Sequence, residues 1–136
     1  MSYEESLKSI SLVADASIGI YTGVPGTPGS PQPHGGKQYY FVKVTGVGQC
    51  GLATGTGDAI GVLQNKPQGV GHAATVGFSG VSNVVAGGAI TAGNSIKADA
   101  NGKAVAATLP ADAAVVLAVA IGTATAADQL IPALLV

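Results

Sequence analysis

QYYFVKVTGV, at Gln38–Val47, is the stretch that decides the fold class, because it is rich in the aromatic and β-branched residues that favour strands. Successive side chains of a strand point to opposite faces, so alternate residues from Tyr40 to Val44 line one apolar face. The other face is mixed, and it carries Tyr39, Phe41, Lys43 and Thr45. We expect this second face to meet water or a partner, and Tyr39 and Phe41 are therefore candidate contacts with another subunit or partner protein.

The rest of the chain repeats the pattern in both directions from this stretch. Short runs rich in Val, Ile, Thr, Tyr and Phe alternate with Gly, Pro, Asn and Asp, which is typical of an all-β domain. Sustained apolar spacing of three and four residues is absent, so we expect little helix. Besides the first stretch, the pattern marks nine further candidate strands, and we expect the chain to form about nine in all: the further candidates are Ser9–Val13, Ser17–Val24, Asp58–Gln64, His72–Ser79, Val81–Ala86, Ser95–Asp99, Lys103–Ala107, Ala114–Ile121 and Gln129–Val136.

Local signals refine this prediction at three places. Asp99 and Gly102 suit the first and last positions of a type I turn with a following bulge, which predicts a hairpin there. Pro110 suits the first position of a single helical turn over Thr108–Ala114. The strand at His72–Ser79 alternates, and its predicted inner face carries Ala74, Val76 and Phe78.

The N-terminal residues 1–12 form a predicted arm, and residues 13–136 a single β domain. Glu4, Glu5 and Lys8 give the arm a polar side, while its apolar candidates for contact with another subunit or partner protein are Leu7, Ile10, Leu12 and Val13. Such an arm can pair within its own subunit or add a strand to a neighbour. We expect it to reach a neighbouring subunit.

Residues 23–36 read GVPGTPGSPQPHGG, with four prolines and five glycines. Prolines cannot join a central ladder, so this segment is predicted to be an exposed loop, with a dedicated binding loop as the alternative.

Composition excludes several classes of function. Charged residues make up 10% of the chain, and its six lysines and seven acids give a net charge of −1, so the basic surface typical of nucleic-acid binding is absent. The longest apolar stretch, Ala113–Ala127, is shorter than the roughly 20 residues of a membrane span, and no signal peptide is expected. The single cysteine, Cys50, fits folding in a reducing cytoplasm. A chain this poor in charge exposes much small apolar surface, which indicates membership of an assembly.

No motif points to an enzyme, a cofactor or a metal. Gly46–Gly51 matches G-x-G-x-x-G, but the residues that follow break helices, so the helix that a dinucleotide site needs is not expected. His34 and His72 have no second ligand nearby in sequence, and Cys50 is better interpreted as a small buried hydrophobe than as a nucleophile. The acidic residues fall at predicted turns and strand ends.

The order and spacing of several short motifs resemble the capsid decoration, or cement, proteins of tailed bacteriophages. The matching pieces read GVLQN, AATV, GVSNVVAG, AGNSIKADANGKA and AIGTATAADQLIPALL, at Gly61–Asn65, Ala73–Val76, Gly80–Gly87, Ala92–Ala104 and Ala120–Leu135. The resemblance implies a β-tulip-like fold, made in the host cytoplasm and assembled as homotrimers on the exterior of the virion capsid. It implies that the partner is the major capsid protein, whose neighbouring subunits such proteins clamp, and it carries over no catalytic residues.

Two functions follow as hypotheses. The first is a structural virion protein that stabilises a phage shell by surface burial. The alternative is a head-fibre or surface adhesin module that binds a host glycan, with the loop at residues 23–36 as its contact.

Overall fold

The computed structural model describes residues 7–18, 37–55, 57–67 and 70–136, and in these residues the prediction of an all-β fold is confirmed. The helical structure there consists of two single 3-10 turns, at Ala16–Ile18 and Ala113–Val115, and no helix in this part could cross a membrane. The strands are β1 (Lys8–Ala14), β2 (Phe41–Gly46), β3 (Gln49–Leu52), β4 (Gly61–Leu63), β5 (Ala73–Val85), β6 (Ser95–Ala98), β7 (Ala104–Ala106), β8 (Ala118–Ala120) and β9 (Leu130–Leu135).

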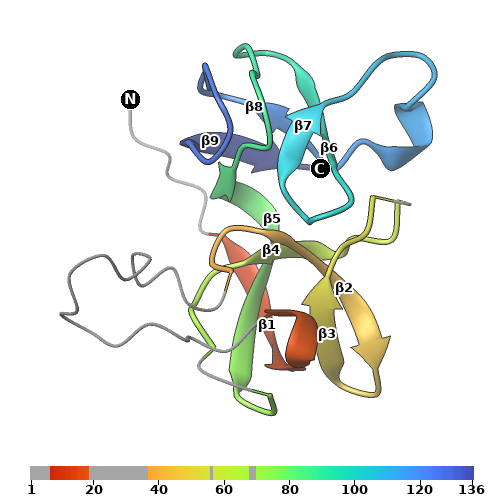
Figure 1. Ribbon diagram of the computed structural model, residues 1–136, viewed down its shortest axis with the longest axis vertical. Helices are drawn as coiled ribbons and strands as arrows, with labels where there is room; N and C mark the ends of the chain where they lie inside the picture. Colours follow the sequence, from red (N-terminus) through yellow and green to blue (C-terminus); the bar gives the residue numbers. More distant parts are fainter. Residues whose placement is uncertain (1–6, 19–36, 56, 68–69) are drawn as a thin grey trace, which may run out of the picture.

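The strands form two halves that share β5 (Figure 1). In the first half, β1 pairs with β3, β3 with β2, β2 with β4, β4 with β5 and β5 again with β1, so the ring closes into a small five-stranded barrel. Its interior is filled by buried apolar side chains: Ala14, Ile18, Val42, Cys50, Leu63, Ala74 and Val76. Each strand therefore buries one face inside the ring, as expected for a barrel of this size.

The second half contains the C-terminal part of β5 followed by β9, β8, β6 and β7. A parallel bridge between Ala86 and Ala104 brings β7 back beside the end of β5, so this sheet also curls round on itself. Its core is built of small residues and a few larger ones, among them Val84, Ile96 and Ile131. Phe41, at the start of β2, is part of this core although it begins a strand of the first half.

The long strand β5 replaces the two strands predicted at His72–Ser79 and Val81–Ala86. Gly80 does not end the strand, because glycine tolerates the φ of +108° found there and β5 passes on into the second half. Ser79 pairs with Lys8 and Gly77 with Ser9, so Phe78 is an extra residue at a bulge. The bulge turns Phe78 outwards, which makes the prediction of an inward Phe78 wrong, whereas Ala74 and Val76 are buried as predicted.

Other predicted elements differ from the structure at their ends. Residues 16–18 form a 3-10 turn, so the strand predicted from Ser17 does not start there, and its remainder, 19–24, lies outside the described residues. A strand that was not predicted, β3, follows a tight turn at Gly48 (φ +65°) and includes the second half of the G-x-G-x-x-G stretch. The predicted hairpin is confirmed: Asp99 Oδ1 accepts hydrogen bonds from the amides of Asn101 and Lys103, at 2.8 and 2.9 Å.

The prediction that the arm reaches a neighbouring subunit is wrong for the described residues from Lys8 onward. These residues form β1, which lies antiparallel to β5 of the same chain. The pairing closes the barrel, so the main-chain groups on one edge of this segment have partners in β5, and those of Val13 and Ala14 also pair with β3. The loop predicted at 23–36 lies outside the described residues.

Candidate interaction surfaces

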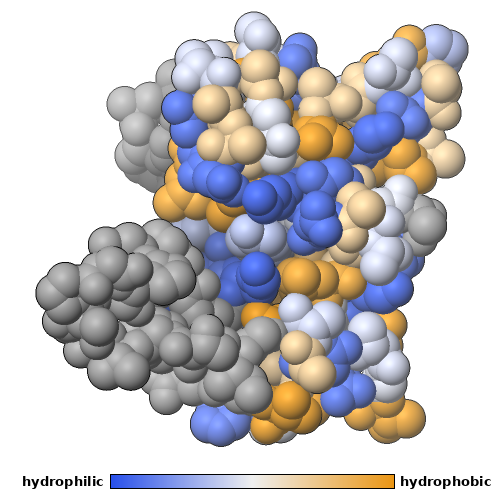
Figure 2. Space-filling model, viewed as in Figure 1, coloured by the Kyte–Doolittle hydropathy of each residue, from blue (hydrophilic) through white to orange (hydrophobic). Residues whose placement is uncertain are grey.

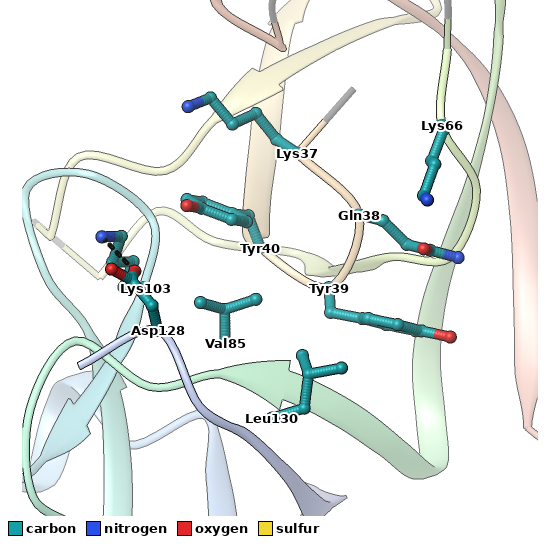
Figure 3. Close-up of a pocket in the computed structure, with 9 residues that line it drawn as sticks. All are labelled: Lys37, Gln38, Tyr39, Tyr40, Lys66, Val85, Lys103, Asp128 and Leu130. Carbon is teal, nitrogen blue, oxygen red and sulfur yellow. Dashed lines mark hydrogen bonds and ion pairs between the residues drawn. The ribbon is translucent and has the colours of Figure 1, made fainter. Parts of the chain in front are cut away.

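A pocket of ≈ 770 Å³ lies where the two halves meet (Figure 3). Its walls come from five places in the chain: the turn before β2, the residues after β4, the end of β5, the residue before β7, and the start of β9 with the residues before it. The lining residues are Lys37, Gln38, Tyr39, Tyr40, Lys66, Val85, Lys103, Asp128 and Leu130. Pockets of this size are typical of small-ligand or peptide sites.

The turn that shapes the pocket is held in an unusual backbone conformation. Lys37 and Tyr39 have φ of +50° and +69°, which costs residues other than glycine about 1–2 kcal/mol each. Hydrogen bonds to both halves hold Tyr39 there: its amide donates to Leu63 O at 2.6 Å, and its carbonyl accepts from Val85 N at 3.0 Å. Positive φ for such residues often marks functional sites, and here it aims Tyr39 and Tyr40 in different directions along the pocket wall (Figure 3).

The pocket gathers half of the lysines of the chain. Lys103 Nζ lies 2.7 Å from Asp128 Oδ1, and this hydrogen bond raises the pKa of Lys103 and lowers the pKa of Asp128. Lys37 Nζ lies 5.2 Å from the centre of the Tyr40 ring, within the range of a cation–π interaction. Burial raises the pKa of the Tyr40 hydroxyl, so the ring stays neutral. With three lysines and one aspartate (3 − 1 = 2), the lining residues carry a net charge of +2.

A second candidate surface is the outer face of β5, β9 and β8. Val81, Leu134 and Val119 are paired across the three strands and so share this face. At one end it continues into a small hollow whose lining includes Ile60, Phe78 and Val136. Phe78 is 42% exposed, Leu134 40% and Val136 73%. We call this set of exposed apolar side chains the apolar sheet face.

The view in Figure 2 shows how polar and apolar residues are distributed on one side of the molecule. A band of hydrophilic residues crosses the molecule between the two halves, and hydrophobic residues lie on both sides of it. Apolar surface is thus interrupted rather than continuous on this side.

The predicted contact residues fall into three groups. Ile10 (44% exposed) and Val13 (39%) are open to a partner. Leu7, Leu12 and Tyr39 are half-buried against the two cores. Phe41 is 1% exposed, so the expectation of a contact surface there is wrong: its side chain fills the core of the second half.

The described residues contain little that resembles a catalytic site. They hold no group of three or more His, Cys, Asp or Glu side chains placed to bind a metal ion. Cys50 is buried, and burial, with a smaller effect of Asp15, raises the pKa of its thiol, so the reactive thiolate is disfavoured. This agrees with its interpretation as a small buried hydrophobe.

The sequence did not indicate the pocket or the apolar sheet face. The pocket lysines are far apart in the chain, and only the fold brings them together. A signal for the apolar sheet face was present in the apolar C-terminal residues LIPALLV, but which residues point outwards depends on the sheet.

An all-β fold with two curled halves joined through one strand is the class that these features define. A solved structure with this fold is that of the head fibre gp8.5 N base in bacteriophage phi29, with a TM-score of 0.59 and 16% sequence identity. The match covers 96% of this chain and 95% of that one, so the likeness extends over the whole fold. No protein-family model and no curated protein matches the sequence.

Proposed function

We propose that this chain is a structural protein of a phage head, bound to the outside of the shell. The observation that carries the proposal is the shared fold, which extends over nearly all of both chains, with a protein named as the base of a phage head fibre. The motifs that resemble capsid decoration proteins point to the same location from the sequence. Charged residues make up only 10% of the chain, which suits a protein whose surface is in permanent contact with other subunits.

The proposed mechanism is stabilisation by binding. A protein that binds only the assembled shell lowers the free energy of that shell relative to open forms, and many symmetric copies add their contributions. The major capsid protein is the proposed partner, and neighbouring capsid subunits would be clamped together by contacts that span them.

A homotrimer is the proposed form of the bound protein. The apolar sheet face is a suitable contact between copies or with the shell, because Phe78, Leu134 and Val136 together expose apolar surface that water disfavours. Closed symmetry buries such a face in every copy. Ile10 and Val13 of β1 are further exposed apolar side chains for contact with the shell, and they lie on opposite faces of the strand.

The second candidate function is a head-fibre module that binds a host glycan. It is favoured by the name of the structural neighbour and by the pocket, in which Tyr39 and Tyr40 provide ring faces beside polar groups.

The test begins with phage particles from a genome that carries this gene and from a matched deletion. We expect the protein on purified heads in a fixed ratio to the capsid protein, and we expect deleted heads to open at lower temperature. Leu134→Ser should weaken binding of the purified protein to deleted heads at least tenfold, whereas Thr91→Ser, an exposed loop change, should not. An absence from heads refutes the proposal, and binding of the isolated protein to host cells with no effect on heads favours the glycan module.

A further inference from the structure

The residues with an unusual backbone conformation converge on the pocket between the two halves. In the described part of the chain, three residues other than glycine have a positive φ: Lys37 (+50°), Tyr39 (+69°) and Asp128 (+68°). All three line this pocket, although they come from two segments far apart in the sequence. Such conformations persist only where the surrounding structure enforces them, and they cluster at ligand sites. Their convergence therefore singles out this pocket as a binding site.

Main-chain hydrogen bonds fix both segments to the end of β5. On one side, Val85 N donates to Tyr39 O at 3.0 Å. On the other side, Asp128 N donates to Ala86 O at 2.7 Å, and Ala86 N donates to Gln129 O at 2.8 Å. The walls of the pocket are thus held in place before any ligand arrives, which lowers the entropic cost of binding.

One part of the lining offers apolar surface. Val85 and Leu130 are paired across β5 and β9, so their side chains point to the same face, and both line the pocket (Figure 3). Leu130 is 54% exposed, so a ligand can reach it. The Tyr39 ring, which also lines the pocket, adds an aromatic surface. Surfaces of this kind suit the C–H face of a ring rather than a charged group.

A second part of the lining both donates and accepts hydrogen bonds. Lys103 Nζ lies 2.7 Å from Asp128 Oδ1, which leaves the second carboxylate oxygen and two N–H groups without a hydrogen-bond partner among the described residues. Burial raises the pKa of Tyr40, so its hydroxyl keeps its proton, and it lies close enough to Lys103 and Asp128 to interact with both charges. Donors and acceptors therefore alternate within a small space.

The charges of the lining disfavour a charged ligand. Lys103 is paired with Asp128, and Lys66 also has a partner within the chain. Lys37 Nζ lies against the Tyr40 ring, 5.2 Å from its centre. Each lysine of the lining is thus already engaged, and the Asp128 carboxylate repels an anion that approaches Lys103. A cation would be repelled by the lysines, whereas hydroxyl groups both donate and accept and so match this lining.

We propose that the pocket binds a neutral sugar ring of a glycan. The C–H face of the ring packs against Val85 and Leu130, while its hydroxyls donate to Asp128 and accept from Lys103 and Tyr40. The volume of ≈ 770 Å³ lies within the range of about 300–1,000 Å³ of small-ligand sites. This inference rests on the second candidate function, for which it names the ligand class, and it is independent of the structural role at the phage head.

NMR titration of the ¹⁵N-labelled full-length protein tests the ligand class. The probes are the methyl glycosides of glucose, galactose, mannose and N-acetylglucosamine, with methyl glucuronide and inorganic phosphate as charged probes. We expect at least one neutral glycoside to shift the amide signals of Tyr40, Lys103 and Asp128 but not that of Ala118 in β8, with a dissociation constant of about 1–10 mM. Absence of these shifts with every neutral glycoside, or tighter binding of a charged probe, overturns the proposal.

Two substitutions that retain the shape of the lining test the contacts. Tyr40→Phe removes one hydroxyl, and Asp128→Asn removes the charge while asparagine tolerates the positive φ. Each should weaken binding of the neutral glycoside about fivefold, as expected for a lost hydrogen bond. The matched control is Asp112→Asn, which breaks the ion pair with Lys97 outside the pocket and should bind like the parent.

Unchanged affinity in Tyr40→Phe or Asp128→Asn, or an equal loss in Asp112→Asn, overturns the proposal. A protein that binds no sugar but is present on purified heads refutes this inference alone and leaves the structural role intact. Sugar binding by a protein that is absent from heads has the opposite meaning, because it supports the pocket and refutes the role at the head.

Discussion

The two phenylalanines of the chain provide a matched test of which apolar side chains hold the fold and which meet partners. Phe41 is 1% exposed and fills the core of the second half from a strand of the first. Phe78 is 42% exposed on the apolar sheet face. Truncation to alanine removes the same atoms from both, so the difference between the variants reports the difference in environment.

The expected magnitudes follow from burial. Phe41→Ala loses the transfer free energy of a buried ring and leaves a cavity between the halves, which costs about 3–5 kcal/mol of the free energy of unfolding. Phe78→Ala loses the benefit of a half-buried ring without a closed cavity, about 1–2 kcal/mol. With a urea dependence of about 2 kcal/mol per molar, Phe41→Ala should lower the unfolding midpoint by about 2 M, and Phe78→Ala by less than about 1 M.

Urea titrations followed by circular dichroism measure both values, and analytical ultracentrifugation of the same samples measures self-association. The comparison of binding is made under conditions in which both variants remain folded. There, Phe78→Ala should weaken self-association or shell binding more than Phe41→Ala does. The reasoning is refuted if Phe78→Ala costs as much stability as Phe41→Ala, or if Phe41→Ala changes the midpoint by less than about 0.5 M.

Three further predictions concern other sites. Gly61→Ala should destabilise the fold strongly, since its Cβ would collide with the backbone of the adjacent strand β5, whereas Gly88→Ala, which has open space, should shift the melting temperature little; equal shifts would contradict this. The Cys50 thiol, buried and of raised pKa, should react with a thiol reagent at pH 8 only after urea unfolding, and rapid reaction of the native protein would show that it is accessible. A hydrogen bond from the Thr108 amide, and then Lys97, lowers the pKa of Asp112, so the contribution of Asp112 to stability is present above pH about 4 and is lost as the pH falls through the lowered pKa. Asp112→Asn should therefore be less stable than the parent at pH 7 and approach it at pH 2, and a difference in urea midpoint independent of pH would contradict that cause.

The strand pattern could be predicted from sequence wherever turn chemistry marks the ends of a strand. Asp99 and Gly102 gave the hairpin of β6 and β7 correctly, because both residues act on the backbone within a few positions. Gly80 was misleading, because a glycine that ends one strand and a glycine that bends a continuous one look alike in sequence. Only the pairing of Ser79 with Lys8 reveals the bulge that turns Phe78 outwards.

The candidate surfaces depend on contacts that a sequence does not contain. Phe41 and Tyr39 lie on the same face of an ideal strand, but the positive φ of Tyr39 ends the alternation before β2 begins. Phe41 is consequently buried, while Tyr39 lines a pocket. Lys37, Lys66 and Lys103 are brought together only by the closing of the first half against the second.

The strand β5 belongs to both hydrogen-bonded rings, so it determines how the chain folds and unfolds. Leu12 must find Ala74, and Val84 must find Ile131, before either ring closes, so folding waits on distant partners and should take milliseconds to seconds. Loss of β5 from one ring opens the core of the other, so the two halves should melt in one cooperative transition rather than in sequence. A cut at Gly80 would separate the residues of β5 that pair in the first half from those that pair with β9, so the two halves would lose the continuous strand that joins them. Force or heat applied to one half is thus resisted by both, up to the point at which the whole domain unfolds.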